Sequence, residues 1–243
     1  MILRQYTDPE RLELAEIASV YLNKSDTDNV KRPLRLIRQR HDAFLKSQFC
    51  RFTYRTSVAT YAHLATYSLA AGAPPPELRA SQSLRASKAD EVFVPADALN
   101  KEETTRVVVD AFDAYHELLS QGEKPQVARY AAPQGVMVSY TMTWSFLLLA
   151  KHFFPDRLWV PGAMLETHTV AKRMWEEVHK QDPELWDTIY EVYGLARHEL
   201  EAMKALQSMK PAELAALLTE HTEEASAYNV LLEQFGSIPS MWS

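Results

Sequence analysis

The spacing of apolar residues along the chain alternates between two periods, which predict its strands and helices. In Phe49–Arg55 every second residue is apolar, and this is the period of a strand with one buried face. Residues 90–95 (DEVFVP) indicate another short strand. In most of the remaining sequence the apolar residues recur at helical spacing.

Helix-start signals locate the first helices. Asp8 followed by Pro9 offers a side-chain acceptor and a fixed φ, so we expect a helix to begin there. Residues 31–47 predict a second helix. The expected apolar face of the first helix consists of Leu12, Leu14, Ile17 and Tyr21.

Two more helices have recognisable ends. Ser57–Ala71 has helical composition and stops at Gly72, a residue type common just after a helix C-terminus. Asn100 with Glu103 resembles a capping box, and the helix that it starts is predicted to run through Leu119.

The longest apolar stretch, Val136–Leu149, is interpreted as a buried helix. It is too short to span a bilayer, and it contains four Ser and Thr residues. After it, helices are expected to fill most of residues 162–235, with Pro183 and Pro211 marking starts. With two or three strands and many helices, the predicted fold class is α+β.

Composition restricts the class of protein. The 243 residues are 47% apolar, which is enough for a substantial core. A net charge of −6 argues against a nucleic-acid polymer as partner. The N-terminus lacks the apolar region of a secretory signal, and the one cysteine, Cys50, excludes a disulfide framework. We therefore expect a cytoplasmic protein with no membrane partner, in which Cys50 is a small buried residue.

Arg32–Arg40 (RPLRLIRQR) is the one basic run of the chain, and its spacing is helical. Two interpretations stay open for it. The run is either a solvated helix face or a strip that binds phosphate.

Several short motifs occur in an order that resembles a known family. Ser83-Leu84-Arg85 precedes Phe93-Val94-Pro95, Ala128-Arg129 leads to Pro133, and His152-Phe153 precedes Ala163–Glu166. This order is similar to that of the flavin-dependent thymidylate synthases, the ThyX family, over roughly residues 35–194. The resemblance implies a ThyX-like, helix-rich α+β fold with a small antiparallel sheet. It also implies one domain over residues 1–243, with 195–243 as a helical C-terminal extension.

The resemblance further implies a site and its ligands. Ser83 and Arg85 would hold a pyrimidine nucleoside monophosphate as substrate, while His152 and Glu166 would lie near FAD. NADPH and a folate one-carbon donor are further ligands that the family suggests, and its shared active sites imply a homotetramer. The implied activity is methylation at C5 of the nucleotide, or related one-carbon or redox chemistry. No catalytic residue is indicated.

The sequence departs from the family at its basic residues. The family's Arg-His-Arg falls at Thr66-Tyr67-Ser68, and a further arginine falls within Phe146–Leu148. Such cations neutralise the phosphates of a flavin dinucleotide and a nucleotide, and burying that charge uncompensated costs several kcal/mol. Either Arg51, Arg55 and Arg79 replace them, or the protein does not bind deoxyuridine monophosphate as the family does.

Two other functions stay open. One is a catalytically inactive protein of the ThyX fold that serves as a scaffold or partner. The other is a helical enzyme with two metal ions, because Asp113 with His116 and Glu176 with His179 place a carboxylate and an imidazole three residues apart. The aromatic residues Trp144, Phe146, Phe153, Phe154 and Trp159 are interpreted as core or as subunit contacts.

Overall fold

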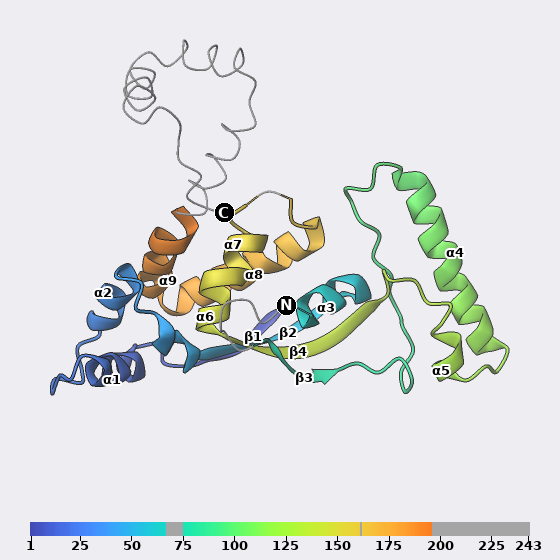
Figure 1. Cartoon of the computed structure of the whole chain (residues 1–243). Helices are drawn as coiled ribbons and strands as arrows, with labels where there is room; N and C mark the ends of the chain where they lie inside the picture. Colours follow the sequence, from blue (N-terminus) through green and yellow to red (C-terminus); the bar gives the residue numbers. More distant parts are fainter. Residues whose placement is uncertain (67–74, 161, 196–243) are drawn as a thin grey trace, which may run out of the picture. The chain divides into compact units, whose positions relative to one another are not determined.

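The computed structural model describes residues 1–66, 75–160 and 162–195, all within the compact unit Met1–Arg197 (Figure 1). The predicted helical extension 195–243 lies outside the described residues apart from Leu195, and so do Gly72 and Pro211. The prediction of one domain over residues 1–243 therefore stays a prediction.

A four-stranded antiparallel sheet organises the unit. Its strands lie in the order β1 (Ile2–Tyr6), β2 (Phe49–Ser57), β4 (Met137–Ser145) and β3 (Glu77–Ser81). The two central strands pair along their whole length, from Phe49 opposite Ser145 to Ser57 opposite Met137. This confirms the α+β fold with a small antiparallel sheet and the strand predicted from the alternation in Phe49–Arg55.

The interpretation of Val136–Leu149 as a helix is wrong. Met137–Ser145 forms strand β4, and only Phe146–Leu148 continues as a short helix, α6. Ser and Thr occupy every second position of this strand, while Val138, Tyr140, Met142 and Trp144 point into the core with at most 5% of their surface exposed. Towards the end of the strand both faces are buried, so Thr143 and Ser145 are only 8% exposed.

The edge strands were not predicted, and the strand expected at 90–95 does not form. Val92 makes only an isolated bridge to Val136. β1 and β3 are short edge strands, and all five residues of β3 are exposed. Four strands in the described residues therefore replace the predicted two or three.

The first helices begin later or end earlier than predicted. α1 (Leu12–Tyr21) starts after Asp8, although the Asp8 carboxylate accepts the backbone N–H groups of Glu13 and Leu14 at 3.0 and 2.7 Å. Leu14 is buried as expected, whereas Leu12 and Tyr21 are exposed. The helix predicted over residues 31–47 is divided into α2 (Arg32–Arg38) and a 3₁₀ turn at Ala43–Lys46.

The helix that starts at Asn100 is confirmed, whereas the helix predicted over Ser57–Ala71 ends at Ala65. Ser57 caps α3 (Val58–Ala65), and Asn100 caps α4 (Lys101–Ser120) by accepting the N–H of Glu103 at 3.2 Å. Pro183 is the first residue of its helix, as predicted. The other helices in the described residues are α5 (Pro125–Ala128), α7 (Phe154–Arg157), α8 (Leu165–Gln181) and α9 (Pro183–Ile189), with π-helical turns at Leu149–Phe153 and Tyr190–Gly194.

The core lies between one face of the sheet and the helices. Figure 1 shows α3, α6, α7 and α8 on the same side of the sheet. The predicted aromatic core is confirmed, because Trp144, Phe146, Phe153, Phe154 and Trp159 are all at most 6% exposed. Cys50 is also fully buried, and burial raises the pKa of its thiol well above the ordinary value. Among the described helices, none is both long and apolar enough to cross a membrane.

Candidate functional site

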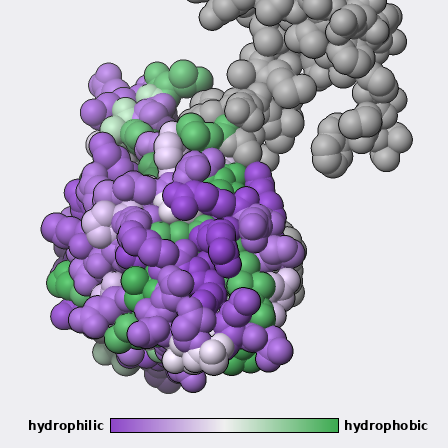
Figure 2. Space-filling view, turned by 90° about the vertical axis from the view of Figure 1, so that its left-hand side faces the viewer, coloured by the Kyte–Doolittle hydropathy of each residue, from purple (hydrophilic) through white to green (hydrophobic). Residues whose placement is uncertain are grey.

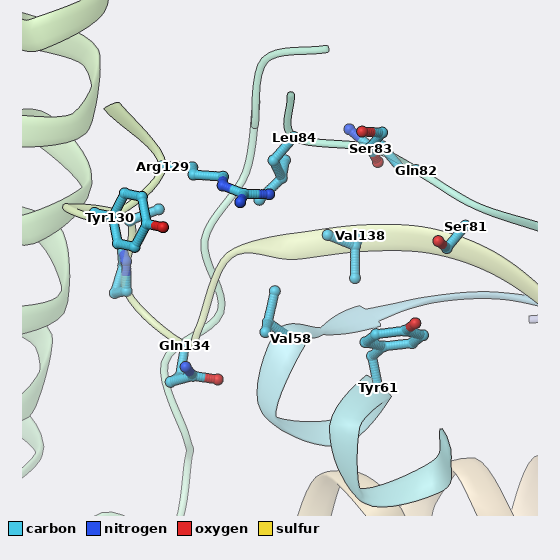
Figure 3. Close-up of a pocket in the computed structure, with 12 residues that line it drawn as sticks. Val58, Tyr61, Ser81, Gln82, Ser83, Leu84, Arg129, Tyr130, Gln134 and Val138 are labelled. Atoms are coloured by element: carbon cyan, nitrogen blue, oxygen red, sulfur yellow. The ribbon is translucent and has the colours of Figure 1, made fainter. Parts of the chain in front are cut away.

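A cavity of about 480 Å³ opens next to β3, between the segment that follows this strand and the connection from α5 to β4. Figure 3 shows its two sides, with Gln82, Ser83 and Leu84 opposite Arg129 and Tyr130. Val58 and Tyr61 of α3 and Val138 of β4 complete the wall. Its volume falls within the range of about 300–1,000 Å³ that is typical of small-molecule sites.

Arg129 is the one charged side chain in the described lining of this cavity. It follows the C-terminus of the short helix α5, and its guanidinium extends towards Leu84 in Figure 3. The guanidinium carbon lies 5.7 Å from the centre of the Tyr130 ring, and Arg129 forms no ion pair with another described residue. Within the part of the chain that the structure describes, this positive charge has no acidic partner and is available to an anionic ligand.

Of the two residues predicted to hold the substrate, the structure places one at the cavity. Ser83 lines it and begins a tight turn, in which its carbonyl accepts the N–H groups of Ala86 and Ser87. Arg85 is exposed and lies outside the lining, although its N–H donates to Ser83 Oγ at 3.4 Å. The neighbouring Gln82 fixes this turn to β4 by hydrogen bonds with the backbone of Ser139.

Glu166, which the resemblance predicts to lie near a cofactor, joins two helix N-termini. Its carboxylate accepts the Ser57 N–H at 2.9 Å, the Ser57 hydroxyl at 2.5 Å and the Thr60 hydroxyl at 2.7 Å. Glu166 lies in the first turn of α8, while Ser57 is the N-cap of α3. It also lines a small, mainly apolar cavity of about 220 Å³ next to Gly135 and Met164, which is separate from the Arg129 cavity except for Gln134.

His152, the other predicted cofactor residue, lies on the π-helical turn Leu149–Phe153. Burial lowers the pKa of its imidazole, with a smaller opposing contribution from the carboxylate of Asp156. It lines neither of the two cavities just described. The structure therefore does not bring His152 to the same cavity as Glu166 or Ser83.

Comparison with known proteins assigns the family. The family described as "Thymidylate synthase complementing protein" (Thy1) matches residues 3–184, which is about three quarters of the chain. This chain belongs to the Thy1 family. No curated protein sequence matches it.

A solved structure agrees with this family fold. The chain is similar to the crystal structure of a UMP/dUMP methylase, PolB from Streptomyces cacaoi, bound with 5-Br dUMP. The TM-score is 0.64 and the identity 19%, and the match covers 79% of this chain and 94% of that one. At this identity the likeness shows the Thy1 fold, and it confirms the fold predicted from the motifs.

In this Thy1 protein the positions expected for the family's arginines are uncharged. Thr66 is the C-cap of α3, where its hydroxyl donates to the Ala62 carbonyl at 2.7 Å, and Tyr67 and Ser68 lie outside the described residues. Phe146, Leu147 and Leu148 are at most 2% exposed. A guanidinium at Phe146, Leu147 or Leu148 would be surrounded by apolar side chains. The loss of the family's arginine therefore coincides with a buried, apolar position.

The arginines proposed as replacements lie away from the core-facing side of the sheet. Arg55 is already paired with Asp90 and Glu91, at 2.7 and 3.0 Å. Arg51 and Arg79 both donate through Nε to Thr143 Oγ1, and Arg79 is also paired with Glu77 at 2.7 Å. None of the three lines the Arg129 cavity.

The geometry gives no support to the two-metal alternative. Among the described residues, no three His, Cys, Asp or Glu side chains gather closely enough to hold a metal ion. The His116 ring packs edge-on against the Phe112 ring, with 4.6 Å between the ring centres. His179 Nε2 lies 2.8 Å from Asp187 Oδ1, so Glu176 is not its partner.

The sequence interpretation missed Arg129, Tyr61 and Gln134 as residues of a site. The signal for Arg129 was present, because Ala128-Arg129 was part of the family resemblance. Nothing local distinguishes Tyr61 or Gln134, because they reach the cavity only through the pairing of β2, β3 and β4.

Proposed function

We propose that the Arg129 cavity binds a pyrimidine nucleoside monophosphate and that the protein has a thymidylate synthase-like activity on this nucleotide. The observation that supports it is the Arg129 guanidinium, which has no ion-pair partner among the described residues and faces the Ser83 turn across a cavity of suitable size, in a chain of the Thy1 family. The similar methylase from Streptomyces cacaoi, bound with 5-Br dUMP, favours the same ligand class.

The lining suggests which residue contacts which part of the nucleotide. Arg129 donates two charge-assisted hydrogen bonds to the phosphate, and the Ser83 hydroxyl adds another. Arg85, at the rim, approaches the same phosphate from solvent. The apolar walls, Leu84 and Val138, suit the flat faces of a pyrimidine, and the Gln134 amide can pair with its polar edge. These residues bind and orient the nucleotide.

The residues present do not fit a flavin dinucleotide held as the family holds it. Its phosphates need several cations, whereas the family's arginine positions among the described residues are Thr66 and the buried Phe146–Leu148. Of the proposed replacements Arg51, Arg55 and Arg79, only Arg51 makes no ion pair with a described residue. We therefore derive no chemical step through FAD, and the roles of His152 and Glu166 near a cofactor, like NADPH and folate, rest on the resemblance alone.

This misfit favours a second candidate, a Thy1-fold protein that binds the nucleotide without turning it over. Fluorescence of FAD released from denatured protein and the melting temperature in excess FAD separate the two candidates. A catalyst should release stoichiometric flavin or show a rise in melting temperature by mass action. Protein that shows neither, yet binds deoxyuridine monophosphate, is the non-catalytic form.

We also propose that the protein is a homotetramer, as the family resemblance implies. α4 has one buried side chain among its twenty residues, Tyr115, and it packs mainly on α5. Val107 and Val109 are 50% and 37% exposed and point to opposite sides of this helix. A helix with apolar residues on both sides is typical of one packed between two partners.

Replacing both valines with aspartate is expected to reduce the assembly to a smaller species, because two charges would enter an apolar contact. Size-exclusion chromatography with light scattering measures the mass of wild type and of Val107→Asp/Val109→Asp. Val20→Asp on α1, which is 75% exposed, is the matched control and should leave the mass unchanged. A wild-type monomer would contradict the proposal.

A further inference from the structure

A third cavity, of about 440 Å³, lies at the loop that joins α1 to α2 and at the start of α2, and it shares no lining residue with the Arg129 cavity. Its lining is entirely polar: Lys24, Asp26, Asn29, Lys31, Arg32 and Arg35. α1 and α2 lie on the left of Figure 1, whereas α5 lies on the right. The left side faces the viewer in Figure 2, where hydrophilic residues predominate.

The wall of this cavity contains a buried cation. Arg32 is only 6% exposed, and its guanidinium pairs with Asp26 Oδ2 at 2.5 Å. It also donates to the Asp26 carbonyl and to the hydroxyl of Ser19, which is fully buried. The hydrogen bond from Arg32 lowers the pKa of Asp26, so the pair stays charged. These contacts fix the shape of the α1–α2 loop around the cavity.

The cavity has more positive than negative charge. Four of its residues are cations, and Asp26 is the one acid of the lining. Lys31 is paired with Glu184, which Arg11 also contacts at 2.6 Å. Lys24 and Arg35 form no ion pair with a described residue. If Asp26 neutralises one of the four cations and Glu184 neutralises Lys31, an excess of two positive charges remains.

The other arginines of the run Arg32–Arg40 contact residues outside this cavity. These contacts decide between a solvated helix face and a phosphate-binding strip. Arg38 pairs with Glu191 at 3.1 Å and contacts the Thr188 hydroxyl. The Arg40 guanidinium lies 5.1 Å from the centre of the Tyr193 ring. The cavity therefore takes its cations from Arg32 and Arg35 of the run and from the preceding loop, so no continuous strip exists.

We propose that this cavity is a binding site for a small, ring-free phosphate anion with at least two negative charges, of the pyrophosphate type. The two excess cations match that charge, and guanidinium and ammonium groups are the usual ligands of phosphate oxygens. A nucleotide is disfavoured because none of the described residues that line the cavity is aromatic or aliphatic, so a base would have nothing to pack against. The site is independent of the proposed nucleotide site.

Isothermal titration of the full-length protein with inorganic pyrophosphate tests this proposal. Wild type should show saturable binding that weakens as sodium chloride is raised, because salt screens exposed charges. Lys24→Ala/Arg35→Ala should weaken binding about 30- to 100-fold, since each lost charged hydrogen bond is worth roughly a factor of ten. Lys172→Ala/Arg173→Ala removes the same charge from exposed positions of α8 and should bind as wild type does.

Two further variants make the result specific. Arg129→Ala should leave pyrophosphate binding unchanged, which separates this site from the nucleotide site. Asp26→Asn removes the one acid of the lining, so binding should strengthen severalfold even though the melting temperature falls with the loss of the Arg32 ion pair. Absence of saturable binding, or equal weakening by the two lysine-arginine double variants, would overturn the proposal.

Discussion

Replacing Glu166 with alanine is expected to lower the free energy of unfolding by about 3 kcal/mol, since unpaired buried donors cost about 1–3 kcal/mol each. The carboxylate accepts three hydrogen bonds, from the backbone and hydroxyl of Ser57 and the hydroxyl of Thr60. Ser57 is 1% exposed and Thr60 fully buried, so their donors lose an acceptor at positions with little access to solvent. Urea unfolding followed by tryptophan fluorescence measures the change.

The matched control is Glu176→Ala on the same helix. Glu176 is exposed, and the same truncation there should change the stability by less than about 0.5 kcal/mol. Glu166→Gln keeps one acceptor oxygen but turns an amide towards the hydroxyls, so its loss should fall between the two. Equal stability of Glu166→Ala and Glu176→Ala would show that this carboxylate does not hold α8 to α3.

The second large effect is expected at the nucleotide site. Arg129→Ala should weaken the binding of deoxyuridine monophosphate by about 2–3 kcal/mol, or about 30- to 150-fold, because the cavity has no other cation in its described lining. Stability should barely change, because Arg129 is exposed and forms no ion pair with a described residue. Isothermal titration measures the affinity, and urea unfolding the stability.

Arg85→Ala provides the comparison, at a residue next to the Ser83 side of the cavity. Arg85 is exposed and outside the lining, so we expect a loss of only about threefold, typical of a screened rim charge. Wild-type affinity in Arg129→Ala would exclude this cavity as the nucleotide site. A greater loss in Arg85→Ala than in Arg129→Ala would place the phosphate on the Arg85 side.

The sequence was sufficient for elements with a local signature and insufficient for those that depend on pairing. Ser57 and Asn100 start helices through their own side chains, and both caps are present. β4 was taken for a helix because its second half is buried on both faces and runs into the apolar segment Phe146–Leu149, and periodicity alone does not distinguish such a buried strand from a helix. β3 is only five residues long and none of its side chains is buried, so its pairing with β4 defines it.

The site shows the same division. The motif order identified the family and pointed to Ser83, but which side chains face one cavity depends on the register between β3 and β4. Glu166 is an example: it belongs to a family motif, but in this fold its carboxylate accepts hydrogen bonds from Ser57 and Thr60 at the start of α3. Its contacts join residues more than a hundred positions apart, which no local pattern in a single sequence reports.

The marginal attachment of β3 has a consequence for ligand recognition. This strand hydrogen-bonds to β4 on one side only, has no buried side chain, and leads directly into the Ser83 turn. Local opening there costs less free energy than in the central strands, so its amide protons should exchange with solvent first. An occupied cavity would slow that exchange, and the binding free energy would include the work of ordering this edge.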